Sequence, residues 1–245
     1  MNISASIKLP RVEGFRMTKN TNPDIFESVA VPDSIKPYVR RALVADTNEL
    51  VDMTVDIRAT GYHYLAWLWR GCWQGQVNGE TTFDSKADGP LALTGQVGKN
   101  VVTTLMQGDI GKIVLEFTVL GHFQLLGIKG MQRASAPQVL NPSLVPYFQR
   151  VFEAKDLTTI ARITLLADVL SALPKHSVPD KIATAIERMD AAHGNIRIAE
   201  LVSEIGLSER RFRTEFDKLI GLSPKAFCKT LQINRAFNQL LMNNG

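Results

Sequence analysis

The stretch from Ile196 to Gly245 constrains the fold of this chain most, because apolar residues recur in it at helical spacing on both sides of a glycine. Gly206 stands where a tight turn needs a positive φ angle, and Ser208 can cap the helix that follows. Gly221 ends that second helix, and a further helix begins at Pro224, a residue tolerated in a first helical turn. The pattern predicts two helices around a glycine turn and a long third helix after them.

The second of these helices has an apolar and a polar face, because a helix advances by about 100° per residue. The apolar face is formed by Phe212, Phe216, Leu219 and Ile220. The opposite face is formed by Arg210, Arg213, Thr214 and Asp217. Basic residues at the start of the second helix are typical of a DNA-binding helix-turn-helix. A helical hairpin with a solvated charged face is the alternative that periodicity leaves open.

The residues of this stretch resemble the first helix-turn-helix of AraC-type transcription regulators. The matching positions are Glu200, Leu201, Gly206, Leu207, Ser208, Phe212, Phe216, Gly221, Ser223, Pro224, Ala236, Leu240 and Leu241. The resemblance implies that residues 180–245 form a partial DNA-binding domain, opened by a helix over residues 180–193. AraC-type domains carry two such units, whereas here the linking helix, expected over roughly 224–242, is followed only by Asn243, Asn244 and Gly245 and by no second unit. We therefore expect weak, salt-sensitive DNA binding by a monomer.

The same resemblance implies roles for the residues at the start of the recognition helix. Arg210, Arg213 and Thr214 would read bases, and an arginine that donates two hydrogen bonds to guanine is worth about 1–3 kcal/mol of discrimination. Ser208, Arg211 and Lys218 are the remaining expected DNA contacts. Arg211 and Lys218 would contact phosphate. The chain departs from the family at Thr214 and at Gln232, where arginine is usual, so it has less positive charge at both positions.

Charge and cysteine content agree with a DNA-binding protein of the cytoplasm. The chain has 28 basic and 24 acidic residues, a net charge of +4, and residues 196–245 hold 8 of the basic and 5 of the acidic ones. Most of the positive excess thus lies on the segment that would meet phosphate. Cys72 and Cys228 fall in different expected domains and form no C-x-x-C pair, which suits a reducing compartment. The start of the chain predicts no signal peptide, and no apolar run predicts a membrane span.

Residues 32–136 are expected to form a β-rich domain. Apolar and polar residues alternate over 51–58 and again over 112–119, and short runs at 62–69, 81–84, 90–95 and 101–107 are bounded by glycines or turn residues. Such strands predict a small barrel or sandwich. The segment 93–127 resembles the cupin-like sensor domain of some AraC-type regulators, with a short helix at 121–126. Residues 1–31 are expected to form an irregular arm, partly ordered against this domain.

Helices are expected to replace strands after Pro137. Residues 142–154 and 157–173 read as two helices, and residues 174–179 as a linker between prolines. The second helix carries an apolar stripe of Ile160, Ile163, Leu166, Ala167, Leu170 and Leu173. Residues 137–173 therefore either cover the β-rich domain or form the seam of a homodimer, and the family resemblance favours the seam.

The dense aromatic run after Gly61 suggests a second site. Tyr62, Tyr64, Trp67 and Trp69, with Arg70 as an anchor for an acidic group, could line an effector pocket. A core strand with aromatic residues at its margin is the alternative.

Enzyme chemistry finds little support in the sequence. The four histidines form no metal-binding motif, and His63, His122 and Glu116 could form a metal site only if they met in space. The sequence contains no G-x-S-x-G elbow, Walker loop or G-x-G-x-x-G motif, so we expect a protein that is not an enzyme and needs no cofactor or metal.

The sequence thus predicts an α+β chain with a cupin-like β-barrel or sandwich, flanking helices and an all-α helix-turn-helix unit. Its expected function is that of an AraC-type transcription regulator, acting as a cytoplasmic homodimer on double-stranded DNA. A small-molecule effector and RNA polymerase are the further expected partners, the latter if it is an activator, and no membrane is involved. Two alternatives remain: an interaction partner that inactivates a full-length regulator, and a ligand-binding cupin.

Overall fold

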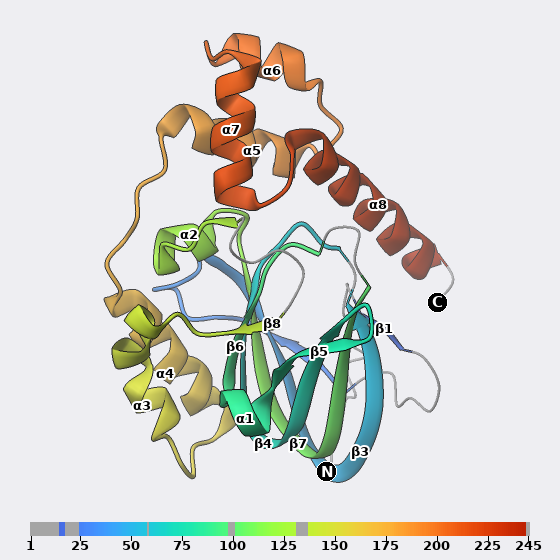
Figure 1. Cartoon of the computed structure of the whole chain (residues 1–245), viewed down its shortest axis with the longest axis vertical. Helices are drawn as coiled ribbons and strands as arrows, with labels where there is room; N and C mark the ends of the chain where they lie inside the picture. Colours follow the sequence, from blue (N-terminus) through green and yellow to red (C-terminus); the bar gives the residue numbers. More distant parts are fainter. Residues whose placement is uncertain (1–14, 18–24, 58, 98–100, 131–136, 244–245) are drawn as a thin grey trace, which may run out of the picture.

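The computed structural model describes residues 15–17, 25–57, 59–97, 101–130 and 137–243. One large antiparallel sheet occupies one end of the molecule, and four helices occupy the other (Figure 1). The expected α+β class with flanking helices and a separate all-α unit is confirmed. No helix among the described residues combines the length and the apolar character that crossing a membrane requires.

The sheet has eight strands in the order β1-β3-β7-β4-β6-β8, with β2 paired to β3 and β5 paired to β4. Its strands are β1 (Phe15–Met17), β2 (Glu27–Val29), β3 (Val39–Ile57), β4 (Tyr64–Val77), β5 (Glu80–Asp84), β6 (Leu91–Thr94), β7 (Val102–Phe117) and β8 (Pro137–Val139). A short helix α1 (Ser85–Asp88) follows β5. Within the described residues, no strand pairing joins the two edges of the sheet, so the strands form an open, curved sheet with two distinct faces (Figure 1).

The prediction of two separate strands at 101–107 and 112–119 is wrong, because both belong to the single strand β7. Gly108 adopts a φ angle of 95° in its middle, and the pairing of β7 with β3 and β4 shifts register close to this point. Gly71 of β4, with a φ angle of 84°, lies opposite. The glycines bend the long strands without ending them, as β-bulges do.

Two further expectations need correction. The arm at residues 1–31 contains strands β1 and β2, which both pair with β3, while residues 1–14 and 18–24 lie outside the described residues. Strands also continue past Pro137, because β8 pairs with β6. Proline is tolerated there because it begins an edge strand, where a missing N–H costs no ladder bond.

One face of the sheet, called here the outer face, is covered by helices. Leu65, Trp67, Ile113 and Leu115 project from it into a buried cluster with α4 (Thr159–Ala172). The expected helix at 142–154 is instead a 3-10 helix η2 (Pro142–Phe148), with Pro146 inside it, followed by one turn of α3 (Gln149–Phe152). The expected short helix is present as α2 (Gly121–Leu126).

The apolar stripe of α4 packs mainly within the chain. Five of its members are buried, namely Ile163, Leu166, Ala167, Leu170 and Leu173, and they belong to the same cluster as the outer face. Ile160 alone is largely exposed, at 64%. These five side chains therefore cover the sheet and cannot at the same time form a seam with a second copy.

The four C-terminal helices are α5 (Asp180–Ala191), α6 (Ile198–Glu204), α7 (Glu209–Ile220) and α8 (Pro224–Asn243). Together they are called here the helical unit. The segment 174–179 that leads to it has no regular structure, but the His176 N–H donates to the Gln124 carbonyl oxygen of α2 at 2.8 Å. The expected linker is therefore attached to the sheet end of the molecule.

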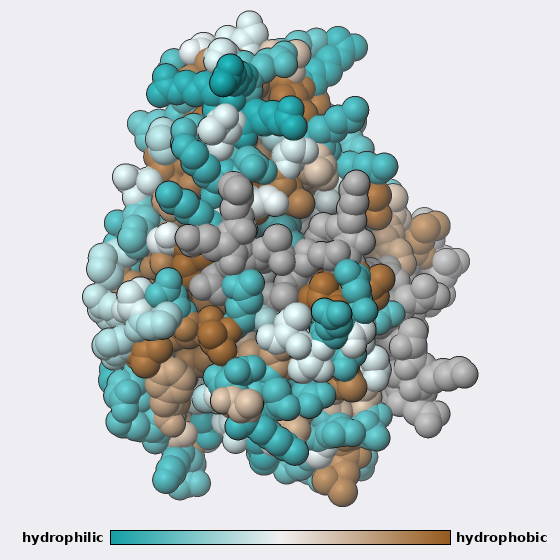
Figure 2. Space-filling view, viewed as in Figure 1, coloured by the Kyte–Doolittle hydropathy of each residue, from teal (hydrophilic) through white to brown (hydrophobic). Residues whose placement is uncertain are grey.

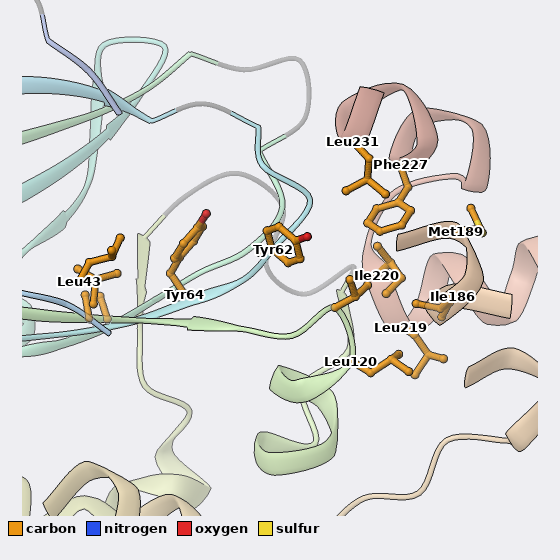
Figure 3. Packing of buried hydrophobic residues seen from close by; sticks show 14 of the residues in the cluster. Leu43, Tyr62, Tyr64, Leu120, Ile186, Met189, Leu219, Ile220, Phe227 and Leu231 are labelled. Carbon is orange, nitrogen blue, oxygen red and sulfur yellow. The ribbon is translucent and has the colours of Figure 1, made fainter. Parts of the chain in front are cut away.

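The other face of the sheet, the inner face, shares one continuous apolar cluster with the helical unit (Figure 3). Tyr64, Trp73 and Met106 contribute from the strands, and Ile220 and Phe227 contribute from α7 and α8. The two ends of the molecule are thus joined by a buried apolar contact as well as by the covalent chain.

Candidate functional site

The turn between α6 and α7 forms as the local sequence predicts. Gly206 adopts a φ angle of 64°, and the Ser208 hydroxyl oxygen accepts from the Arg211 N–H at 3.3 Å. Gly221 ends α7 with a φ angle of 81°. These caps satisfy backbone groups that would otherwise be orphaned at the ends of α7, so the helix is well defined at the end that carries the basic residues.

A core of phenylalanines holds α7 in place. Phe212 and Phe216 are fully buried, with their ring centroids 5.5 Å apart, and Phe216 lies 5.5 Å from the ring of Phe227 on α8. Leu219 and Ile220 are buried on the same face, as the periodicity predicts. With this face occupied, the opposite face of α7 must point to solvent.

The exposed face of α7 carries the residues expected to contact DNA. Arg210, Arg211, Arg213 and Thr214 are exposed, as are Ser208 and Lys218. In the part of the chain that the structure describes, the three arginines form no ion pair, whereas Lys218 pairs with Glu215 at 3.2 Å. The surface over α6 and α7 is mainly hydrophilic in the view of Figure 2. The arginines are therefore free to meet a polyanion.

A groove lies beside this face, between α6, α7 and the start of α8. Its polar lining consists of Glu209, Arg210, Arg213, Thr214, Ser223 and Lys225. Lys225 was not among the DNA-binding residues expected from the sequence. Its position in the first turn of the helix that begins at Pro224 could have indicated that it lies beside α7. The groove brings a third cation beside Arg210 and Arg213.

The residues expected to form an effector pocket do not meet. Tyr62 and Tyr64 project from the inner face, whereas Trp67 and Trp69 lie on the other side of β4, where the Arg162 guanidinium lies 5.0 and 4.8 Å from their ring centroids. This separation follows from alternation along a strand. The prediction that these residues line one shared effector pocket is therefore wrong.

Arg70 is also placed differently from the expectation. It lies where β3, β4 and β7 bend, and its guanidinium pairs with Asp46 at 2.8 Å and with Asp109 at 2.7 Å. Because two carboxylates already balance its positive charge, Arg70 is poorly suited to bind an acidic ligand.

A small cavity lies on the inner face instead. Its walls include Tyr64, Trp73, Thr104, Met106, Lys112 and Val114. Its volume of about 20 Å³ is enough for roughly one water molecule. Of the expected pocket residues, Tyr64 alone lines it.

Lys112 gives this cavity its chemical character. The side chain is only 4% exposed, and its ammonium lies 3.5 Å from the centroid of the Trp73 ring. No carboxylate among the described residues pairs with it. Burial lowers the pKa of Lys112 to about 7, because a charged amine loses its hydration there. The cavity thus holds one amine, able to carry a positive charge, in apolar surroundings.

The buried carboxylate of Glu116 lies near the cavity but has partners of its own. It accepts from Arg40 at 2.7 Å, from Arg41 at 3.2 Å and from the Tyr64 hydroxyl at 3.3 Å. His63 and His122 do meet, with stacked rings 3.4 Å apart. Within the described residues, however, no three His, Cys, Asp or Glu side chains are placed to hold a metal ion.

Comparisons with known proteins give similarity to solved structures. No family model matches the sequence, and no curated protein matches it. Apo ToxT from Vibrio cholerae is 12% identical with a TM-score of 0.43, covering 81% of this chain and 82% of that chain. ToxT with a bound unsaturated fatty acid is 12% identical with a TM-score of 0.40, covering 78% and 77%. The AraC-like transcriptional activator CuxR is 13% identical with a TM-score of 0.26, covering 89% and 90%. These alignments cover most of this chain, but at identities and TM-scores that assign it no function.

Proposed function

We propose that this chain is a transcription regulator that binds double-stranded DNA through α7. The observation that carries the proposal is the position of Arg210, Arg213 and Thr214 on the exposed face of the second helix of a helix-turn-helix. Their side chains stand opposite a fully buried phenylalanine face, so the same packing that stabilises the helix presents them to solvent. A helix presented in this way fits the major groove of B-DNA.

The proposal divides the cations between base reading and phosphate contact. Arg210 and Arg213 are not engaged by carboxylates of the described residues, so each can donate two hydrogen bonds to guanine. Arg211 and Lys225 flank them and are placed for phosphate. Lys218 is a weaker candidate than we expected, because its ammonium is already paired with Glu215. Phosphate contacts position the helix, and base contacts select the sequence.

Selection of binding sites from a pool of random duplexes with the full chain tests this proposal. The selected site is then titrated against Arg213→Ala and against Lys86→Ala, a matched control that removes one positive charge from exposed α1, away from the helical unit. We expect Arg213→Ala to relax the base preference at one position and Lys86→Ala to leave it unchanged. Failure to enrich any sequence, or equal effects of both variants, would contradict the proposal.

The regulator that we propose responds to a small acidic molecule with an apolar body. Lys112 supports this, because a buried ammonium without a carboxylate partner gains most from an anion that arrives with an apolar group. The cavity holds only about one water molecule, so such a ligand must displace its walls. Trp73 lies against Lys112 and provides a fluorescent signal for binding.

A matched series of ligands tests the acidic group. Decanoate, decanol and decylamine share one chain and differ in charge, and each is titrated against the intrinsic fluorescence of the full chain. We expect a saturable change with decanoate alone, and its loss in Lys112→Met. Equal responses to decanoate and decanol would mean that Lys112 does not select an anion.

We further propose that the regulator is a homodimer. Phe152, Leu157 and Ile160 are exposed apolar residues on and between α3 and α4, and Leu157 lines an open groove there. Because the rest of the α4 stripe is buried against the sheet, these three supply the apolar surface for a second copy. Sedimentation of Ile160→Glu should then show a weaker dimer than the wild type, and a wild-type monomer at all concentrations would refute the proposal.

A further inference from the structure

Five consecutive buried residues, Thr60 to Tyr64, lie between the Lys112 cavity and the helical unit. This stretch is called here the connecting segment. Figure 3 shows Tyr62 of this segment between Tyr64, on the sheet, and the helical residues Ile220 and Phe227. The segment therefore contacts both the site proposed for the effector and the helices proposed to hold DNA.

Two hydrogen bonds attach the connecting segment to the helical unit. The Tyr62 hydroxyl donates to the Asp190 carboxylate of α5 at 2.8 Å, and the Asn234 side-chain amide of α8 donates to the Thr60 carbonyl oxygen at 3.0 Å. These bonds span 128 and 174 residues of sequence. They join separate parts of the fold and are not local turn contacts.

Close packing adds to this attachment. Gly61 adopts a φ angle of 89°, and a Cβ atom added to it would lie 2.9 Å from Leu231 Cδ2 and 3.3 Å from Phe227, both on α8. Glycine thus allows α8 to approach the backbone of the segment closely.

His63 of the connecting segment reaches α7 through His122 of α2. The His63 ring stacks on the His122 ring, and His122 Nε2 lies 3.1 Å from the Leu219 carbonyl oxygen near the end of α7. Three of the four helices therefore meet the segment directly or through one side chain.

Tyr64 connects the segment to the cavity. Its ring lines the cavity, and its hydroxyl lies 2.5 Å from the Thr60 hydroxyl and 3.3 Å from the Glu116 carboxylate. Burial raises the pKa of Tyr64, so the hydroxyl keeps its proton and its hydrogen bonds at physiological pH. The Arg40 guanidinium pairs with Glu116 and also lies 3.9 Å from the Tyr62 ring centroid. The Glu116 carboxylate thus contacts Tyr64 directly and Tyr62 through Arg40.

We propose that the connecting segment couples occupancy of the Lys112 cavity to the position of the helical unit, with the Tyr64 hydroxyl as the joint. A ligand that enlarges the cavity must displace its walls, and Tyr64 is the wall residue that is bonded to Thr60. Movement of Tyr64 strains the Thr60 backbone, which holds Asn234 of α8. Packed elements with two discrete arrangements transmit such small displacements. The role in DNA regulation rests on the proposed function, whereas the mechanical coupling does not.

Hydrogen exchange of the full chain tests the coupling without any ligand. Tyr64→Phe keeps the ring in the cavity wall and removes the hydroxyl, whose hydrogen-bond partners among the described residues, Thr60 and Glu116, lie outside the helical unit. We expect amides of α5 and α8 to exchange about five-fold faster, because the segment that holds them loses a buried hydrogen bond. Amides of α4, on the outer face, should keep their wild-type rates. Tyr147→Phe, on exposed η2, is the matched control.

A double variant decides whether the effect passes through Thr60. If it does, adding Asn234→Ala to Tyr64→Phe increases exchange in α8 by less than the product of the two single effects. Wild-type exchange in α5 and α8 of Tyr64→Phe, or fully multiplicative effects, would overturn the coupling. DNA affinity is measured on the same proteins, so a wild-type chain that binds no DNA would refute the proposed function while the exchange data still decide the coupling.

Discussion

Replacing Lys112 by methionine should make the stability of the protein less dependent on pH. Methionine has a similar length, is apolar and adapts to irregular spaces, so it can fill the position without a charge. The Trp73 ring favours the charged form of Lys112, and burial opposes it. Burial is the larger effect and lowers the pKa from the ordinary 10.5 to about 7.

The size and sign of the effect follow from this shift. Between pH 7 and 10.5 the unfolded chain holds the Lys112 proton while the folded chain has largely lost it, so raising the pH stabilises the folded state. With these two pKa values, the wild type gains about 2 kcal/mol from pH 7 to pH 9 through this residue. Below pH 7 both states hold the proton, and the dependence disappears.

Urea unfolding of both proteins at pH 6, 7, 8 and 9 measures this effect. We expect Lys112→Met to be the more stable protein at pH 7, and its advantage to shrink by about 2 kcal/mol by pH 9. Lys155→Met is the control, because Lys155 is exposed and its loss should show no such trend. An advantage of Lys112→Met that stays constant across this range would refute the reasoning that Lys112 is buried without a carboxylate partner.

Three further predictions concern the helical unit. Arg213→Ala should weaken specific DNA binding by about 10-fold or more without lowering the thermal midpoint, and a lowered midpoint would make Arg213 structural. Phe216→Ala should cost about 3–5 kcal/mol in urea unfolding, because a fully buried ring between two others is lost, and a cost below about 1 kcal/mol would contradict the assigned face. Gly61→Ala should speed proteolysis within 174–179, because the added Cβ would press on Leu231 and loosen the helical unit, and an unchanged rate would mean that the close approach is not needed.

Local signals explain why the helical unit was predicted well. The turn at Gly206, the cap at Ser208 and the end at Gly221 depend on residues within a few positions of one another. The buried face of α7 follows from a period of 3.6 residues, whatever the helix packs against. The exposed arginines then follow by elimination, because the opposite side of the same helix must face solvent.

The sheet was predicted less completely because its features depend on distant residues. A glycine within a strand and a glycine at a strand end look alike in sequence, and only pairing with β3 and β4 makes Gly108 a bend inside β7. The 3-residue strand β8 exists because β6 lies beside it. The effector pocket was misplaced for a related reason, since alternation separated Tyr64 from Trp67 but did not indicate which face would enclose a cavity.

The sequence by itself determined the α+β class, the helix-turn-helix and the basic face of α7, because local periodicity and capping decide them. Only the tertiary structure decided that the Lys112 amine is buried in a cavity and that Arg70 is paired with Asp46 and Asp109. It alone placed Tyr62 against Asp190. The physical reason is that burial and ion pairing depend on which segments meet, and these segments lie 24 to 128 residues apart in the chain.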